Sequence, residues 1–218
     1  MFRRLRATLL CSCYVTLLAL PLFAAGSPIE RIGPPTVAGI SDDLKKAVDD
    51  KGYRVVLDDG WTGDFWFARS LATATKDSPG ALYPELSNGE FVALASLPKG
   101  ASDFRGQAIP AGVYTLRYQY IPQDANHMGV SPNPDFLLAI PVASDTAPAE
   151  AIPYKRLVAL SAKASGTAHP AVFALSPAGT PANVSKDDSG MIILTVEVPT
   201  AAGKRAKLGI VVKGQATQ

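Results

Sequence analysis

Residues 113–121 read VYTLRYQYI, and the alternation within this stretch decides the fold class. One set of alternate positions carries Tyr114, Leu116, Tyr118 and Tyr120. The positions between them carry Val113, Thr115, Arg117 and Gln119. Because successive side chains of a strand point to opposite faces, the stretch predicts a β-strand with one face in the core and one face in water.

Short apolar runs of the same kind recur on both sides of this stretch, at residues 53–58, 64–70, 90–97, 135–142, 171–175, 191–198 and 207–212. Turn formers separate them, as in Asn88-Gly89 and Pro110-Ala111-Gly112, which is typical of strands joined by tight turns. About eight short strands of this kind are typical of an antiparallel sandwich or barrel. We predict a mostly β fold, an antiparallel β-sandwich of jelly-roll or immunoglobulin-like type.

Two segments show helical spacing instead. Residues 41–52 begin with Ser41 as a candidate helix cap and should form a short helix that ends near Gly52. Residues 153–163 place apolar side chains on one helical face. We expect this second helix to cover a sheet edge or an end of the barrel.

The first 26 residues have the pattern of a secretory signal peptide. Three arginines precede an apolar stretch from Ala7 to Phe23, and small residues follow. We expect cleavage after Gly26 and export to the periplasm or the cell exterior; the alternative is an uncleaved membrane anchor. Residues 27–40, rich in Pro and Gly, are then an N-terminal arm, and residues 41–218 a single domain.

Loss of this segment changes the charge and the cysteine content. The full chain has 21 basic and 19 acidic residues; without the three arginines of the signal, 18 basic residues remain against 19 acidic ones, a net charge of −1. Both cysteines, Cys11 and Cys13, are lost, so the mature chain has no disulfide and depends on burial for its stability. No basic run remains that could follow a phosphate backbone, so we expect neither nucleic acid nor, after cleavage, a membrane as partner.

The segment FRGQAIPAGVYTLRY, residues 104–118, resembles a pattern in uncharacterised exported bacterial proteins of β-sandwich type. The matching residues form a turn and an I-P-A-G-x-Y-T-L motif: Gly106, Ile109, Pro110, Ala111, Gly112, Tyr114, Thr115 and Leu116. The resemblance implies the fold and the exported class, and it brings no catalytic residues. The motif also has a purely structural explanation, because Pro110 fixes a turn that Gly112 closes.

Signatures of common enzyme classes are absent: the sequence has no G-x-S-x-G, no H-E-x-x-H, no P-loop and no C-x-x-C in the mature chain. Four acidic pairs, which begin at Asp42, Asp49, Asp58 and Asp187, lack calcium-loop spacing and stand at expected caps and turns. We therefore favour a protein that is not an enzyme, predict no catalytic residues and no cofactor, and leave open a catalytic site assembled from distant residues.

The alternative is a metal site of His127, Met128 and His169. Imidazole nitrogens with a thioether in an oxidising compartment suit copper, with zinc as the second choice. Asp124, Asn126 or Asp135 could complete the ligand set. The competing interpretation is structural: the histidines would fix their loops by hydrogen bonds, Met128 would fill a gap in the core, and Asp135 would accept loop amides.

Aromatic side chains offer another alternative. Trp61, Trp66 and Tyr118 would stack on a carbohydrate, or enter a protein partner's pocket, if they were exposed on the sheet. Buried, they would belong to the core or cover its edge. The sequence as a whole thus predicts an exported, non-enzymatic binding or structural β-module of unknown ligand, with the metal site and the carbohydrate site as alternatives.

Overall fold

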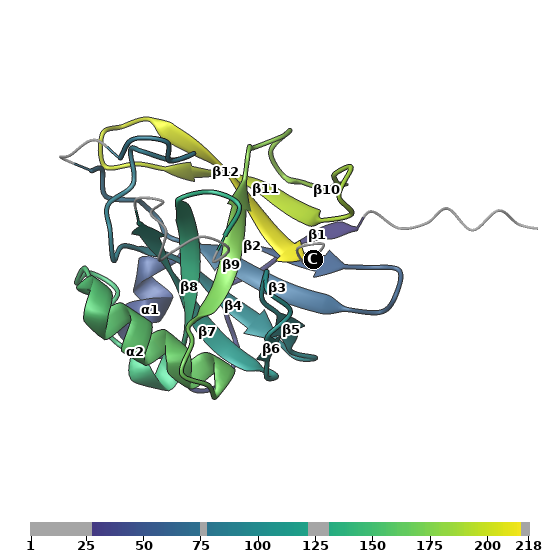
Figure 1. Cartoon of the computed structure of the whole chain (residues 1–218), viewed down its shortest axis with the longest axis horizontal. Coiled ribbons are helices and arrows are strands. Elements are labelled where there is room, and N and C mark those ends of the chain that lie inside the picture. The colour runs from purple at the N-terminus through teal and green to yellow at the C-terminus, as the bar shows by residue number, and fades with distance from the viewer. Residues whose placement is uncertain (1–27, 75–77, 122–130, 215–218) are drawn as a thin grey trace, which may run out of the picture.

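The structure, a computed structural model, describes residues 28–74, 78–121 and 131–214. The fold is mostly β and antiparallel with two α-helices, as the sequence predicts. Ten strands form a single sheet that curls until it is nearly barrel-shaped (Figure 1). In order across the sheet they are β1 (Ile29–Ile32), β2 (Gly52–Val56), β3 (Thr62–Phe67), β4 (Phe91–Leu97), β7 (Gly112–Tyr120), β8 (Asp135–Pro141), β9 (Ala171–Ser176), β12 (Arg205–Lys213), β11 (Ile192–Pro199) and β10 (Asn183–Lys186). The short strands β5 (Ala101–Ser102) and β6 (Ala108–Ile109) pair separately.

The prediction of a two-sheet sandwich is wrong, because hydrogen bonds connect the ten strands from β1 to β10 without a break. The segments that follow β3 and β11 also meet. The amide of Leu71 donates to the carbonyl of Pro199 at 2.9 Å, and the amide of Ala201 donates to the carbonyl of Leu71 at 2.8 Å. The two halves of the curled sheet therefore touch at a seam on the β3 and β11 side.

The eight predicted strands are all present, and four further strands were missed. Strand β1 lies inside the segment predicted to be an arm, where it pairs with β2 from Ile29↔Val55 to Ile32↔Gly52. Strand β10, Asn183–Lys186, is mostly polar and exposed because it is the last strand of the sheet. Polar edge strands and two-residue strands lack the apolar alternation by which the others were recognised.

The concave side of the sheet holds the main core, which includes Phe65, Leu94, Leu116, Tyr118, Leu137 and Leu208. Burial of such apolar side chains supplies the main favourable term of folding. Part of the convex side is also covered. Helix α2 (Tyr154–Ser165) packs its Leu157 against Phe136, Leu138 and Ile140 of β8. The expected helix is confirmed, but it covers the middle of the sheet rather than an edge.

The second face of β7 is not in water, which corrects the prediction of one wet side. Thr115, Arg117 and Gln119 are buried. Residues 142–153, which begin with the 3-10 helix η1 (Val142–Ser144) and which we call the strap, fold back over this face. Because the strap covers this face, β7 is buried on both sides, even though polar and apolar residues alternate along it.

The helix boundaries follow from their caps. Helix α1 (Asp42–Ala47) begins after Ser41, whose hydroxyl accepts from the amide of Leu44 at 3.2 Å, as predicted. It ends earlier than Gly52, because Val48 is extended and bridges to Ala68. Helix α2 ends at Gly166, with φ of 67° and an amide that donates to Ala162.

Candidate functional site

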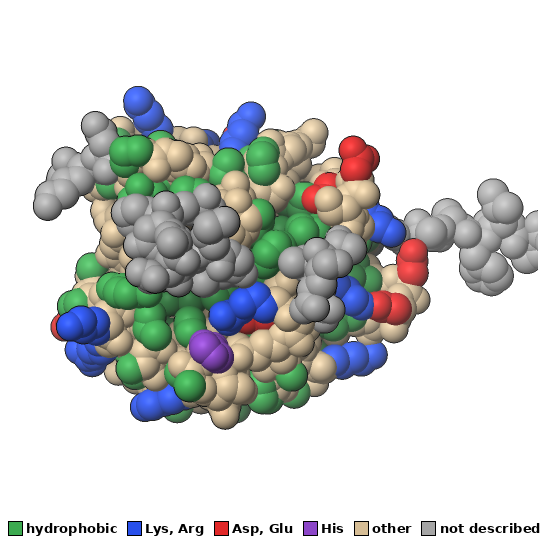
Figure 2. All heavy atoms as spheres, viewed as in Figure 1, with side chains coloured by type: hydrophobic (Ala, Val, Ile, Leu, Met, Phe, Trp, Pro, Cys, Tyr) green, Lys and Arg blue, Asp and Glu red, His purple; other side chains and the backbone are tan. Residues whose placement is uncertain are grey.

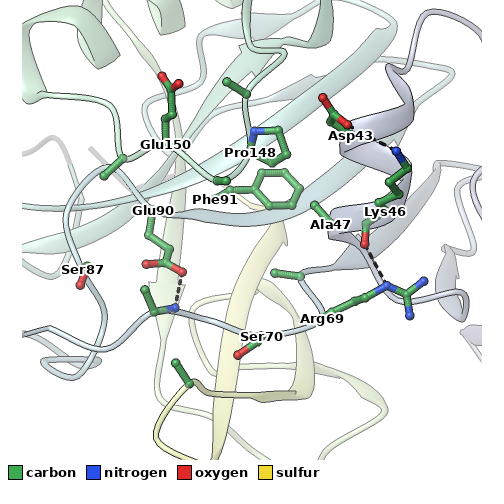
Figure 3. A pocket seen from close by; sticks show the side chains of 16 residues that line it. Asp43, Lys46, Ala47, Arg69, Ser70, Ser87, Glu90, Phe91, Pro148 and Glu150 are labelled. Atoms are coloured by element: carbon green, nitrogen blue, oxygen red, sulfur yellow. Dashed lines mark hydrogen bonds and ion pairs between the residues drawn. The ribbon is translucent and has the colours of Figure 1, made fainter.

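A hollow of about 910 Å³ opens between α1, the segment that follows β3, and the strap. Phe91 of β4 and Pro148 of the strap lie in its middle (Figure 3). Alanines make up much of the remaining wall: Ala47, Ala68, Ala72, Ala147, Ala149, Ala151 and Ala201. These side chains are too small to fill the hollow, and their methyl groups make its surface apolar.

Glu90 stands on one wall of the hollow, next to Phe91 (Figure 3). Its carboxylate accepts a hydrogen bond from the backbone amide of Ala72. Partial burial raises the pKa of Glu90, and the amide of Ala72 and the charge of Arg117 only partly oppose that effect. The carboxylate is thus half withdrawn from water and incompletely neutralised.

The opposite wall carries Lys46 and Arg69 (Figure 3). The Arg69 guanidinium donates to the carbonyl of Lys46 at 2.9 Å and to the carboxylate of Asp50 at 2.5 Å. The Lys46 ammonium lies 3.7 Å from the carboxylate of Asp43. These two positive charges are therefore already paired with neighbours, which leaves Glu90 as the partly buried charge of the wall.

A buried ion pair fixes the strap that closes the hollow. Arg117 is fully buried, and its Nε and Nη2 donate to the two carboxylate oxygens of Asp145, each at 2.7 Å. The same guanidinium donates to three backbone carbonyls, those of Gly89, Ala147 and Glu150. The Thr115 hydroxyl donates to Asp145 at 2.6 Å. Complete hydrogen bonding of this kind offsets the cost of burying a charge pair. Here it holds the strap and the segment at Gly89 against β7.

Asp135 has a structural role at the other end of β7. Its carboxylate accepts from the amides of Leu82 at 3.0 Å and Tyr83 at 2.9 Å, as its loop-amide interpretation predicts. The Tyr118 hydroxyl lies 3.3 Å from the same carboxylate and 3.0 Å from the carbonyl of Tyr83. The Tyr83 hydroxyl in turn donates to Ser176 and accepts from the amide of Gly209. Burial raises the pKa of Tyr83 to about 12 and also raises that of Tyr118, so both phenols stay protonated donors at neutral pH.

The three aromatic side chains that would have to be exposed to stack on a carbohydrate are buried, as the competing interpretation expects. Tyr118 has no exposed surface, and Trp61 and Trp66 are 9% and 3% exposed. Each indole N–H donates to a backbone carbonyl at 2.8 Å, Trp61 to Gly100 and Trp66 to Gly33. Burial thus leaves none of the three rings free to stack on a sugar.

Of the predicted metal ligands, His127 and Met128, with Asp124 and Asn126, lie outside the described residues, so the metal alternative stays a prediction. His169 is exposed and borders a small crevice of about 110 Å³ with Phe136, Leu138 and Val158. The part of the chain that the structure describes contains no group of three or more His, Cys, Asp or Glu side chains placed to hold a metal ion.

The acidic pairs act largely as predicted, in caps and turns. Asp49, Asp59 and Asp187 each accept the amide two residues further on. Sequence reasoning missed the hollow, since alanines and single charges from five separate segments have no common pattern. The one available signal is Arg117, a charge amid the apolar residues of β7, for which the alternation predicts a wet face.

Comparison with protein-family models, with curated proteins and with solved structures finds no match for this chain. Neither helix of the described residues is long and apolar enough to cross a membrane. Figure 2 shows Lys and Arg side chains scattered over one face of the molecule rather than gathered in a patch. The geometry of the hollow is therefore the feature of the molecule that best indicates a function.

Proposed function

We propose that the protein is an exported, non-enzymatic binding module whose ligand enters the hollow beside α1. The observation that carries this proposal is a space of about 910 Å³ with an apolar floor at Phe91 and a half-buried carboxylate, Glu90, on its wall. Concave, mostly apolar sites with few polar groups are where proteins bind small molecules. Export follows from the signal-like pattern of residues 1–26.

The charges of the hollow define the ligand class. Three acidic side chains, Asp43, Glu90 and Glu150, line it against two basic ones, Lys46 and Arg69. Both basic side chains are paired within their own wall. A ligand with an apolar body and one positively charged group would place its body on Phe91 and its charge at Glu90, where partial burial strengthens the attraction.

Binding rather than catalysis fits the way the polar groups are used. Glu90 accepts a hydrogen bond from a backbone amide, and Arg69 donates to a carbonyl and to Asp50. The guanidinium of Arg117 is already hydrogen-bonded to Asp145 and to backbone carbonyls. Groups held in this way shape a rigid surface. A preformed rigid site lowers the entropic cost of binding.

The test is calorimetric titration of the mature chain with phenethylamine, with 3-phenylpropionate as the anionic counterpart of similar size. We expect saturable binding of the amine with a Kd of about 1 mM, a common strength for so small a ligand, and weaker or no binding of the anion. Ala151→Trp should abolish amine binding by filling the hollow. Ala159→Trp places the same side chain on the exposed side of α2 and should leave binding unchanged. Equal binding of both probes, or binding unaffected by Ala151→Trp, would reject the hollow as the site.

Export has its own test. The full-length chain expressed in a bacterium should yield a soluble protein outside the cytoplasm whose mass corresponds to a chain that begins at Ser27. Recovery of the uncleaved chain in the membrane fraction would instead establish the anchor alternative.

A further inference from the structure

A second pocket, of about 220 Å³, lies at the seam of the curled sheet. We call it the seam pocket. Arg31 of β1, Tyr53 of β2 and Phe67 of β3 line it from one side, and Glu197 of β11 and Arg205 of β12 line it from the other. Asp49 and Lys51, from the link between α1 and β2, complete it. Apart from Ala68, its lining residues differ from those of the hollow.

Tyr53 is the unusual residue of this pocket. It is only 7% exposed, yet its hydroxyl makes no hydrogen bond with any residue that the structure describes. The other buried tyrosines of the described chain all have a partner: Tyr83 donates to Ser176, Tyr114 to Pro110 and Tyr118 to Tyr83. The hydroxyl itself is not fully enclosed, so it can donate to a group that enters the pocket.

The surroundings of the Tyr53 hydroxyl favour a negatively charged group. Burial is the main cause that raises the pKa of Tyr53, so the hydroxyl remains a donor at neutral pH. The Arg31 guanidinium lies over the Tyr53 ring at 4.0 Å from its centre. Within the described residues neither Arg31 nor Lys51 forms an ion pair through its side chain.

The acidic side chains of the pocket are already engaged. Glu197 accepts from the Nε of Arg205 at 3.0 Å, and Asp49 accepts from the backbone amide of Lys51 at 3.0 Å. Three basic side chains thus stand against two acidic ones, and the two basic side chains without a carboxylate partner come from β1 and from the link before β2. This balance is the reverse of that in the hollow.

We propose that the seam pocket binds a compact oxyanion, a phosphate or carboxylate group, which accepts the Tyr53 hydroxyl proton and pairs with Arg31 and Lys51. Arginine and lysine with a hydroxyl donor are the usual ligands of such groups. The space of about 220 Å³ fits a small anion or the charged end of a larger molecule. Because both sides of the seam line the pocket, the bound anion also stabilises the closed sheet.

The experiment is an NMR titration of the mature chain with sodium phosphate, and separately with sodium succinate, each exchanged for chloride at constant ionic strength. We expect saturable shifts at the amides of Arg31, Tyr53 and Arg205 with at least one of the anions. Saturation by phosphate alone identifies a phosphate site, and saturation by succinate alone identifies a carboxylate site.

Variants separate this site from general attraction of anions. Tyr53→Phe keeps the ring and removes the hydroxyl, and it should weaken binding about tenfold, the size expected for one hydrogen bond to a charged group. Arg31→Gln should weaken it similarly. Arg54→Gln removes the same charge from the exposed face of β2, and Tyr154→Phe removes an exposed hydroxyl; both should leave binding unchanged. No saturable shift with either anion, or affinity that Tyr53→Phe leaves unaltered, would overturn the proposal.

Discussion

Arg117 carries a full charge in the interior, and the surrounding residues offset the cost of its burial. Its guanidinium is hydrogen-bonded to Asp145 and to carbonyls of Gly89, Ala147 and Glu150. Alternation along β7 correctly places Arg117 on the face opposite the main core, but that face is buried and not in water. The sequence of β7 alone could not show that the strap, some thirty residues later, would cover that face.

Removal of one partner of this pair should be strongly destabilising. Asp145→Asn leaves the buried Arg117 charge uncompensated, and we expect a loss of about 3–5 kcal/mol in the free energy of unfolding. The control is Asp64→Asn, which breaks the ion pair with Arg54, whose side chain is 46% exposed; its cost should be about 1 kcal/mol or less. Urea denaturation measures both. Equal losses in the two variants would contradict the structural role of the buried pair.

Glu90 should make stability depend on pH in a defined direction. Because burial raises its pKa above the ordinary value of 4.5, its contribution to stability is complete below about pH 4.5 and is lost as pH rises through its folded pKa. Glu90→Gln stays neutral and can still accept from Ala72. The variant should therefore be more stable than the native chain at pH 7, by less than about 1 kcal/mol because water screens the half-exposed group, and no more stable at pH 4.

Thermal unfolding at the two pH values measures this difference. Glu85→Gln, which removes an exposed carboxylate from the same loop region, controls for the change in net charge. If Glu90→Gln were destabilising at pH 7, the hydrogen bond to Ala72 would outweigh the cost of burying the charge.

The elements differ in how well the sequence predicts them. The eight apolar runs became strands and the two helical patterns became helices, because side-chain period reports which face of an element is buried. The exceptions have particular causes. β1 and β10 are mostly exposed and pair along only one edge, so their side chains show no apolar alternation. The strap has no period at all, and its position depends on side chains of β7.

The junction between the strap and the sheet lies at Gly89. Gly89 has φ of +77°, and a Cβ there would overlap the backbone of Ile152, whose amide donates to the Gly89 carbonyl at 3.2 Å. Gly89→Ala should cost about 1–2 kcal/mol from backbone strain and a further 1–3 kcal/mol from the overlap. It should also loosen the wall of the hollow.

Gly203→Ala is the matched control, since Gly203 has φ of +73° and nothing within 4 Å of a Cβ. It should show only the cost of backbone strain. Chemical denaturation of both variants gives the comparison. Equal costs would mean that the strap yields to the added methyl group and does not fix the hollow.

At the scale of the whole molecule, short strands with turn residues between them predict an antiparallel β fold but leave its closure open. A sandwich and a curled single sheet have the same local patterns. What decides here is the pairing of β9 with β12, through Gly209↔Ser176 and Ile210↔Leu175, which joins the two halves of the sheet. These partners are more than thirty residues apart, and no local pattern specifies them.

The buried tyrosines predict how the whole molecule responds to alkali. Burial raises the pKa of Tyr83 to about 12, and it raises that of Tyr53, Tyr114 and Tyr118. Their contribution to stability is complete below the ordinary value of 10 and is lost as pH rises from there towards the folded values. The chain should therefore unfold cooperatively between about pH 10 and 12, and absorbance of these tyrosinates should rise together with the loss of native tryptophan fluorescence. Ionisation of all tyrosines near pH 10 with fluorescence unchanged would contradict their burial.

NMR mapping of phenethylamine bound to the mature chain shows whether the hollow beside α1 is the ligand site. We expect shifts concentrated at the amides of Ala47, Ala72, Phe91 and Ala151, which lie on four separate segments and meet around the hollow. Shifts centred instead on the crevice beside His169, or spread evenly over the surface, would contradict it.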